Sequence, residues 1–206
     1  MFISFEGGDG SGKTTLSQIL FQKMSKKFPV ILTKEPGGGN LFNIRMREIL
    51  INFFDKIDSH TEALLYAADR TEHLKKVILP ALKDNKIVIC DRYLDSSFAY
   101  QGYGRGLDEN FIKKINFLSL QHLPQITFYL DLDPNIGIQR LKNTRKNKIE
   151  YFDLKQITFH QKVREGFLKL CDEYPERIHK LDASASVETL VSIIENKIEK
   201  LFRIKI

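Results

Sequence analysis

The chain has 206 residues, 42% of them hydrophobic, which suits one domain with a sizeable core. It contains no apolar run near the roughly 18 residues that cross a bilayer, no signal-peptide pattern at its start and only two distant cysteines, so we expect a cytoplasmic protein without a membrane partner. The net charge of +6 suits an anionic ligand, but the basic residues are scattered except between Arg140 and Lys148, which disfavours nucleic acid.

Short apolar runs alternate with longer helical patterns along the chain. The short runs predict strands at Phe2–Phe5, Val30–Thr33, Ile87–Cys90, Ile126–Leu130 and Ile178–Leu181. Apolar spacing predicts helices at Lys13–Lys26, Ile44–Phe54, Thr61–Lys83, Glu109–Gln121, Pro134–Lys142, Phe152–Tyr174 and Val187–Phe202. This alternation predicts an α/β fold in which a five-stranded parallel sheet carries helices on both faces.

Glycines gather directly after the first strand, in the segment FEGGDGSGKTT (Phe5–Thr15). The segment satisfies GxxxxGK[ST] between a strand and an amphipathic helix, which indicates a P-loop NTPase fold; Lys13 would reach the β- and γ-phosphates and Thr14 would ligate Mg²⁺. The predicted nucleotide-binding residues of this loop are Gly7, Gly8, Asp9, Gly10, Ser11, Gly12, Lys13, Thr14 and Thr15. Outside the phosphate loop no DxxG switch follows a strand, and the chain has no guanine-reading NKxD element, which disfavours a GTP-dependent switch.

The predicted third helix contains two different stripes in TEALLYAADRTEH. At 3.6 residues per turn, Tyr66, Arg70 and His73 fall together, opposite a core stripe made of Leu64, Ala67, Ala68, Leu74 and Ile78. An aromatic ring and a guanidinium one turn apart can stack on a base and bond its carbonyl edge, although a solvent-facing Tyr and Arg would give the same pattern. His73 fits a hydrogen-bond partner better than a catalyst.

The third strand runs directly into Asp91-Arg92-Tyr93, at the end of a parallel strand where ligands bind in such sheets. Asp91 can hold Mg²⁺ and Arg92 can clamp an acceptor phosphate, whereas a simple Asp–Arg ion pair is the alternative. The nearby phosphate loop favours the functional interpretation. A polar, basic stretch at Asn143–Glu150 predicts a lid at about 140–151 within a single domain of residues 1–206.

The motifs FEGGDGSGKTT, TKEPGGG, LLYAADRTEH, DRYLDSSFAYQGYGRG, FYLDLDP and DASAS occur in the order seen in thymidylate kinases. The chain therefore resembles the bacterial type of this family over nearly its whole length, with DRYLDSSFAYQ as the most discriminating string. The resemblance implies ATP-dependent, Mg²⁺-assisted phosphorylation of dTMP to dTDP in dTTP biosynthesis by a homodimeric phosphotransferase.

The resemblance also assigns roles to individual residues. Tyr66 would stack on the thymine, Arg70, Ser97 and Gln101 would recognise it, and Tyr100 would exclude a ribose 2′-hydroxyl. Arg92 and Arg47, with Arg45 as the alternative to Arg47, would hold the acceptor phosphate near Glu35. The implied catalytic residues are Lys13, Arg92, Asp91, Arg145 and Asp9, the implied metal-binding residues are Thr14, Asp91 and Asp9, and the further donor-binding residues are Arg140, Lys148, Asp182 and Ala183.

Two departures from the family pattern are visible. Gly39 stands where EPGGT has threonine, and one extra residue precedes Met46-Arg47. In the basic segment, Asn147 and Lys148 replace the usual Asp and Arg, and lysine cannot form a planar bidentate clamp. Two other functions stay open: another P-loop kinase for a deoxynucleoside or nucleoside monophosphate, and a nucleotide-dependent regulator without kinase activity.

Overall fold

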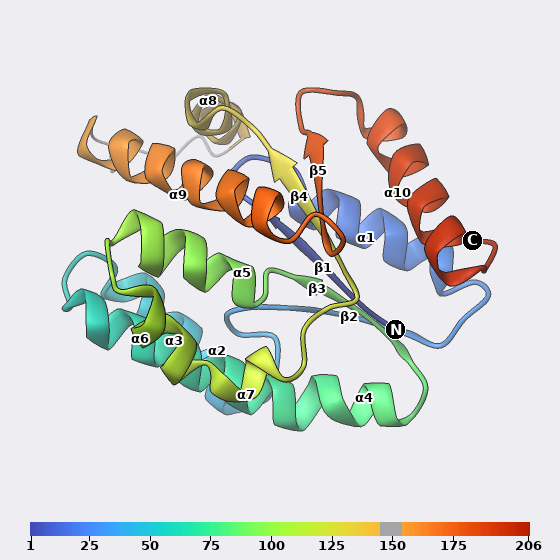
Figure 1. Cartoon of the computed structure of the whole chain (residues 1–206), viewed down its shortest axis with the longest axis horizontal. Helices are drawn as coiled ribbons and strands as arrows, with labels where there is room; N and C mark the ends of the chain where they lie inside the picture. The colour runs from blue at the N-terminus through green and yellow to red at the C-terminus, as the bar shows by residue number, and fades with distance from the viewer. Residues whose placement is uncertain (145–153) are drawn as a thin grey trace.

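A computed structural model describes residues 1–144 and 154–206 of the chain, and its side chains outside residues 143–156. Its strands form one parallel sheet in the order β2-β3-β1-β4-β5 (Figure 1). The strands are β1 (Phe2–Gly7), β2 (Val30–Lys34), β3 (Ile87–Asp91), β4 (Ile126–Asp131) and β5 (Ile178–Asp182). The five predicted strands and their parallel arrangement are confirmed, and each strand extends one or two residues beyond its predicted end.

Helices cover both faces of this sheet. Alternate strand residues, such as Ile3 and Phe5, pack on one face against α1 (Lys13–Met24) and α10 (Val187–Phe202). Phe2, Val88 and Tyr129 point to the other face. The helices whose side chains join the core on that face are α3 (Ser59–His73), α4 (Leu79–Lys83), α5 (Leu94–Ser97), α6 (Glu109–Ile115), α7 (Phe117–Leu120) and α9 (Leu154–Glu173). α2 (Leu41–Asn52) packs against α3, and α8 (Pro134–Thr144) packs against α9.

The helix predicted over Thr61–Lys83 is not one regular helix. A π-helical turn, η1 (Leu74–Ile78), separates α3 from α4. Pro80 lies just beyond this turn and has no N–H to donate to the preceding turn, which is the usual cause of such a local widening. α2 also differs from its prediction: it begins at Leu41 because the Asn40 side chain caps the Phe42 and Asn43 amides.

Two further segments correct the sequence prediction. The segment after β3, where no helix is predicted, is helical: α5 continues into a π-helical stretch, η2 (Phe98–Gly104). The helix predicted at Glu109–Gln121 breaks into α6 and α7 at Asn116, whose side chain is engaged in a buried hydrogen bond to Arg70. Within the described residues, no helix is long and apolar enough to span a membrane.

Candidate active site

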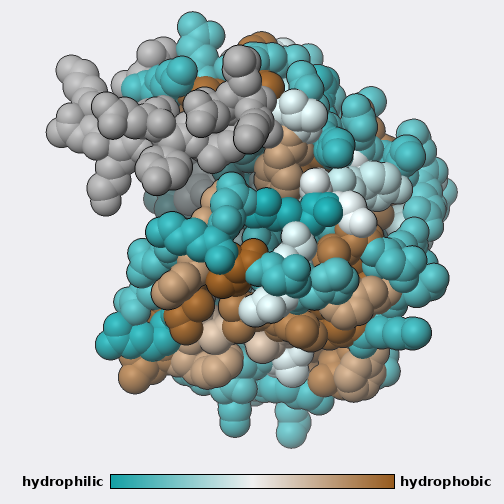
Figure 2. All heavy atoms as spheres, turned by 90° about the vertical axis from the view of Figure 1, so that its left-hand side faces the viewer, coloured by the Kyte–Doolittle hydropathy of each residue, from teal (hydrophilic) through white to brown (hydrophobic). Residues whose placement is uncertain are grey.

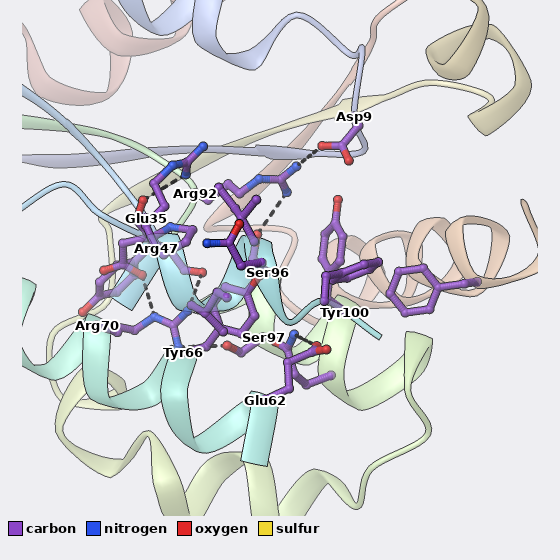
Figure 3. A pocket seen from close by; sticks show the side chains of 18 of the residues that line it. Asp9, Glu35, Arg47, Glu62, Tyr66, Arg70, Arg92, Ser96, Ser97 and Tyr100 are labelled. Carbon is purple, nitrogen blue, oxygen red and sulfur yellow. Dashed lines mark hydrogen bonds and ion pairs between the residues drawn. The ribbon is translucent and has the colours of Figure 1, made fainter. Parts of the chain in front are cut away.

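A cavity of about 630 Å³ lies beside the phosphate loop, at the carboxyl ends of the strands (Figure 3). Its walls come from the phosphate loop, the segment after β2, helices α2 and α3, the segment from β3 to η2, and α9. All eight residues predicted to bind the substrate line it: Glu35, Arg47, Tyr66, Arg70, Arg92, Ser97, Tyr100 and Gln101. The fold thus gathers these scattered residues in one place.

Lys13 begins α1 and is nearly buried within the phosphate loop. Its Nζ donates to the Gly8 carbonyl at 2.7 Å, and Ser11 Oγ lies 3.5 Å away. Burial, followed by the positive charge of Arg92, lowers the pKa of Lys13 to about 8. Gly12 caps the helix with φ of 93°, a left-handed conformation that glycine adopts without strain.

Thr14 and Asp91 meet across the sheet edge, where Thr14 Oγ1 donates to Asp91 Oδ2. A hydroxyl and a carboxylate are oxygen ligands of the kind that Mg²⁺ prefers, so this pair fits the predicted metal-binding role. Asp9, the third predicted metal ligand, instead forms an ion pair with Arg92 at 2.8 Å and lines the cavity. Its role toward a metal ion stays a prediction.

Arg92 is held in position by several contacts (Figure 3). Its guanidinium donates to the Gly7 carbonyl at 2.9 Å and to Ser96 Oγ at 3.3 Å, and it lies 4.9 Å from the centre of the Tyr100 ring. Its backbone has φ of 71°, which is uncommon for a residue with a side chain and is concentrated at functional sites. The alternative of a simple Asp91–Arg92 ion pair is wrong, because Arg92 pairs with Asp9.

Arg70 lies at the floor of the cavity and is 2% exposed. Its Nε donates to Glu35 at 2.7 Å and its Nη1 donates to Ser97 and Asn116. Its Nη2 makes one long contact of 3.4 Å to the Tyr93 carbonyl. Because a guanidinium has five N–H donors, these four contacts leave one Nη2 donor without a partner among the residues that the structure describes.

The stripes predicted on α3 need a correction. Leu64 and Ala68, expected in the core, are exposed, whereas Arg70 and His73 are buried. The polar stripe faces the cavity wall because Glu35 accepts hydrogen bonds from Arg70 and contacts His73 Nδ1 at 2.9 Å. His73 also bonds Thr33, so its expected role as a hydrogen-bond partner is confirmed.

Arg47 and Arg45 lie in different environments. Arg47 lines the cavity and donates to the Pro36 carbonyl at 3.1 Å, whereas Arg45 is exposed, pairs with Glu48 and does not line the cavity. The geometry therefore favours Arg47 over Arg45 as the second arginine of the site.

The geometry agrees with comparisons to known proteins. A family model described as thymidylate kinase matches residues 5–194. The chain belongs to the thymidylate kinase family. It is 57% identical to a thymidylate kinase of Onion yellows phytoplasma (strain OY-M) over the whole of both chains, and 46% identical to one of Acholeplasma laidlawii (strain PG-8A), with 97% and 99% of the chains covered.

A solved structure supports the same assignment. The crystal structure of thymidylate kinase from Ehrlichia chaffeensis matches with a TM-score of 0.80 and 35% identity, covering 96% of this chain and 98% of that one. Membership in the thymidylate kinase family makes the chain an enzyme of the phosphotransferase class, with the expected P-loop α/β fold.

In this thymidylate kinase family member, Asn43 occupies the space beside Gly39. A Cβ added at Gly39 would lie 2.0 Å from Asn43 Oδ1. The fully buried Asn43 side chain accepts from the Asn40 amide and donates to the Asp69 carbonyl and carboxylate, each at 2.8 Å. At the position where the sequence departs from EPGGT, Asn43 thus fills the space that a larger side chain would need.

Gly39→Ala should reduce stability, because the Asn43 amide would have to leave its buried partners. The expected loss is about 1–3 kcal/mol in the free energy of unfolding, measured by urea denaturation. Gly102→Ala is the matched control, since its Cβ would meet only the Ser97 carbonyl oxygen at 4.0 Å. Equal stability of the two variants would contradict the anchoring role of Asn43.

On the expected donor side, Arg140 joins two segments. Its Nη1 donates to the Ala183 carbonyl at 3.1 Å and contacts the Gly10 carbonyl at 3.4 Å. Asp182 is exposed and accepts from the Ser184 amide and hydroxyl, which forms the turn after β5. The phosphate loop and this turn are therefore neighbours. Arg145 and Lys148 lie outside the described residues, and their expected roles stay predictions.

Several residues of the site are not among those predicted from the sequence. Glu62 lies one turn before Tyr66 on the same helix face, so the helical spacing could have revealed it. Asn116, Phe159 and His160 carry no such signal, because they come from distant segments. Asn116 bonds Arg70, while Phe159 and His160 line the cavity from α9.

Proposed function

We propose that this protein transfers the γ-phosphoryl group of ATP to the 5′-phosphate of dTMP, giving ADP and dTDP. The observation that carries the proposal is the cavity beside the phosphate loop, where Arg70 keeps one donor for a base carbonyl and Arg92 presents a cation toward an acceptor phosphate. Tyr66, one turn from Arg70, supplies an aromatic ring for stacking.

The chemistry follows from charge and positioning. A nucleoside monophosphate has a second pKa near 6, so its attacking oxygen is ionised at neutral pH without a general base. Lys13 and Arg92 would offset the charge on the transferred oxygens, with Arg47 and Asp9 completing the acceptor site. When bound at Thr14 and Asp91, Mg²⁺ would supply further neutralisation of the phosphate charge.

The decisive experiment is a coupled assay of ADP release with ATP and Mg²⁺. It compares dTMP, dUMP, dCMP, dGMP and thymidine as acceptors. We expect the highest kcat/KM with dTMP. Turnover of thymidine but not dTMP would assign the protein to the deoxynucleoside kinases instead, and nucleotide binding without any phosphorylated product would favour a regulator.

The pKa of Lys13 predicts a specific dependence on pH. The unliganded enzyme carries a protonated Lys13 below pH about 8 and loses this charge above it, so kcat/KM for ATP should fall above about 8. The fall should approach tenfold per pH unit. Lys13→Arg is the control: a guanidinium stays charged in this range, so its residual activity should not show the fall. The same fall in both variants would exclude Lys13 as its source.

Tyr100 is proposed to exclude ribonucleotides. Its ring packs edge-on against Phe159 and Phe167, with centroids 6.0 and 6.2 Å away, which holds it in the cavity wall. Tyr100→Ala should raise kcat/KM for the ribonucleotide counterpart of dTMP, which carries a 2′-hydroxyl, relative to kcat/KM for dTMP. The expected rise is about tenfold or more, because the ring no longer fills the space of that hydroxyl. Tyr100→Phe keeps the ring and should keep the wild-type ratio. An unchanged ratio in Tyr100→Ala would contradict the role.

We also propose that the protein is a homodimer acting in the cytoplasm. Large apolar side chains are exposed on α2 and beside it: Leu41, Phe42, Ile44, Ile49, Ile51, Phe53, Phe54 and Leu64. Figure 2 shows such side chains in the lower half of the face that carries α2, α3 and α6. Exposed apolar patches of this kind mark interaction surfaces. Light scattering should give twice the chain mass, and Ile44→Glu should give the monomer mass.

A further inference from the structure

The Gln101 side chain lies in the cavity wall and forms a hydrogen bond to a buried carboxylate. Gln101 Nε2 donates to Glu62 Oε1 at 3.0 Å, and both side chains are 3% exposed. Since an ionised carboxylate can only accept, the NH₂ end of the Gln101 amide has to face Glu62. The chemistry of the partner therefore fixes the amide orientation, which coordinates alone would leave open.

Glu62 is itself held in place by a cation. Arg105 Nη2 donates to Glu62 Oε2 at 2.8 Å, and the same guanidinium also pairs with Asp55. The Arg105 guanidinium carbon lies over the rings of Phe54 and Phe159, 4.9 and 4.8 Å from their centres. The ion pair with Arg105, whose guanidinium also contacts two aromatic rings, holds the Glu62 carboxylate in one position.

The carbonyl end of the Gln101 amide is left for a ligand. Among residues 1–142 and 157–206, no donor bonds Gln101 Oε1, and this oxygen is not sealed from solvent. Gln101 lines the cavity together with Arg70, which has a second Nη2 donor besides the one directed to the Tyr93 carbonyl. The cavity therefore offers a donor from Arg70 and an acceptor from Gln101.

We infer that Glu62 is a positioning residue that makes the site select an imide base over an aminopyrimidine by fixing the Gln101 amide. Thymine and uracil present a carbonyl acceptor at C4 and an N–H donor at N3, which complement the Arg70 donor and the Gln101 acceptor. Cytosine presents an amino donor and a ring-nitrogen acceptor, which is the reverse pattern. The inference rests on the proposed function, because it assumes that the cavity holds the base of the acceptor nucleotide.

The test is the ratio of kcat/KM for dTMP to that for dCMP in Glu62→Gln. A glutamine at position 62 can donate or accept, so the Gln101 amide can turn and accommodate cytosine. We expect the ratio to fall by about tenfold or more, mainly through a higher KM for dTMP. The ratio of dTMP to dUMP should stay unchanged, because both bases present the same edge. A general loosening of the cavity would change the dTMP to dUMP ratio as well.

Three variants control the comparison. Arg105→Lys keeps the countercharge and should lower the melting temperature while preserving the dTMP to dCMP ratio. Gln101→Met has no amide to orient and shows the dTMP to dCMP ratio that remains without any hydrogen bond from position 101 to the base. If Glu62→Gln does not fold, the double variant Glu62→Gln/Arg105→Met removes the cation with its partner and should show the same fall.

The outcomes separate this inference from the proposed function. Wild-type enzyme that does not phosphorylate dTMP would overturn the proposed function. Wild-type turnover of dTMP with an unchanged dTMP to dCMP ratio in folded Glu62→Gln, or in the double variant, would overturn the inference alone. An equal fall in Arg105→Lys and Glu62→Gln would also overturn it, since the effect would then come from disturbed packing.

Discussion

Lys13→Ala should lower kcat for phosphoryl transfer to dTMP by about 10³-fold or more. The ammonium group is nearly buried in the phosphate loop, where water screens its charge poorly, so its interaction with phosphate oxygens is strong. Within the described part of the chain, its hydrogen bonds go to the Gly8 carbonyl and the Ser11 hydroxyl, both neutral groups. A nucleotide phosphate would give this charge an anionic hydrogen-bond partner.

The same variant should keep its fold. Burial has already lowered the pKa of Lys13, which means that its charge is unfavourable in the folded protein. Removing the charge should therefore leave the melting temperature unchanged or slightly higher. Lys23→Ala is the matched control, because Lys23 lies on the same helix and pairs with Glu195 at the surface. Near-normal turnover in Lys13→Ala would show that its assigned role is wrong.

The sheet and the location of the site could be predicted from the sequence because both depend on local patterns. The strands are short apolar runs, and the phosphate loop is a contiguous motif whose glycines and lysine act through neighbouring atoms. The residues from Asp91 to Gln101 emerge at one strand end, so their proximity to the loop follows from parallel topology.

The features that the sequence does not predict depend on tertiary contacts. Asn116, where α6 and α7 break, and the buried Arg70 share a hydrogen bond between residues 46 positions apart, which no local pattern records. The prediction of which α3 residues are buried is wrong for the same reason. Hydrophobicity alone places an arginine at the surface, but Arg70 is buried because Glu35 compensates its charge. The helical path of η2 is another such case, because its residues pack against α9, which lies far along the chain.

Arg92→Ala should reduce kcat/KM for dTMP by about 10³–10⁵-fold, the range associated with a positioned arginine in phosphoryl transfer. The guanidinium joins the two halves of the site: it bonds the Gly7 carbonyl of the phosphate loop and lies against Tyr100 of the acceptor cavity. The backbone of Arg92 holds a left-handed conformation that aims the side chain there. Its loss removes charge neutralisation and alignment of the acceptor together.

Two further variants make this prediction specific. Arg92→Lys keeps a positive charge but not the planar fork, so its kcat/KM should lie between those of wild type and Arg92→Ala. Arg45→Ala removes an exposed arginine outside the cavity and should leave kcat/KM unchanged. Arg92→Ala also loses its bonds to Gly7 and Asp9, so a modest drop in melting temperature is expected. If folded Arg92→Ala retained activity close to that of Arg45→Ala, the acceptor phosphate would have to be held elsewhere.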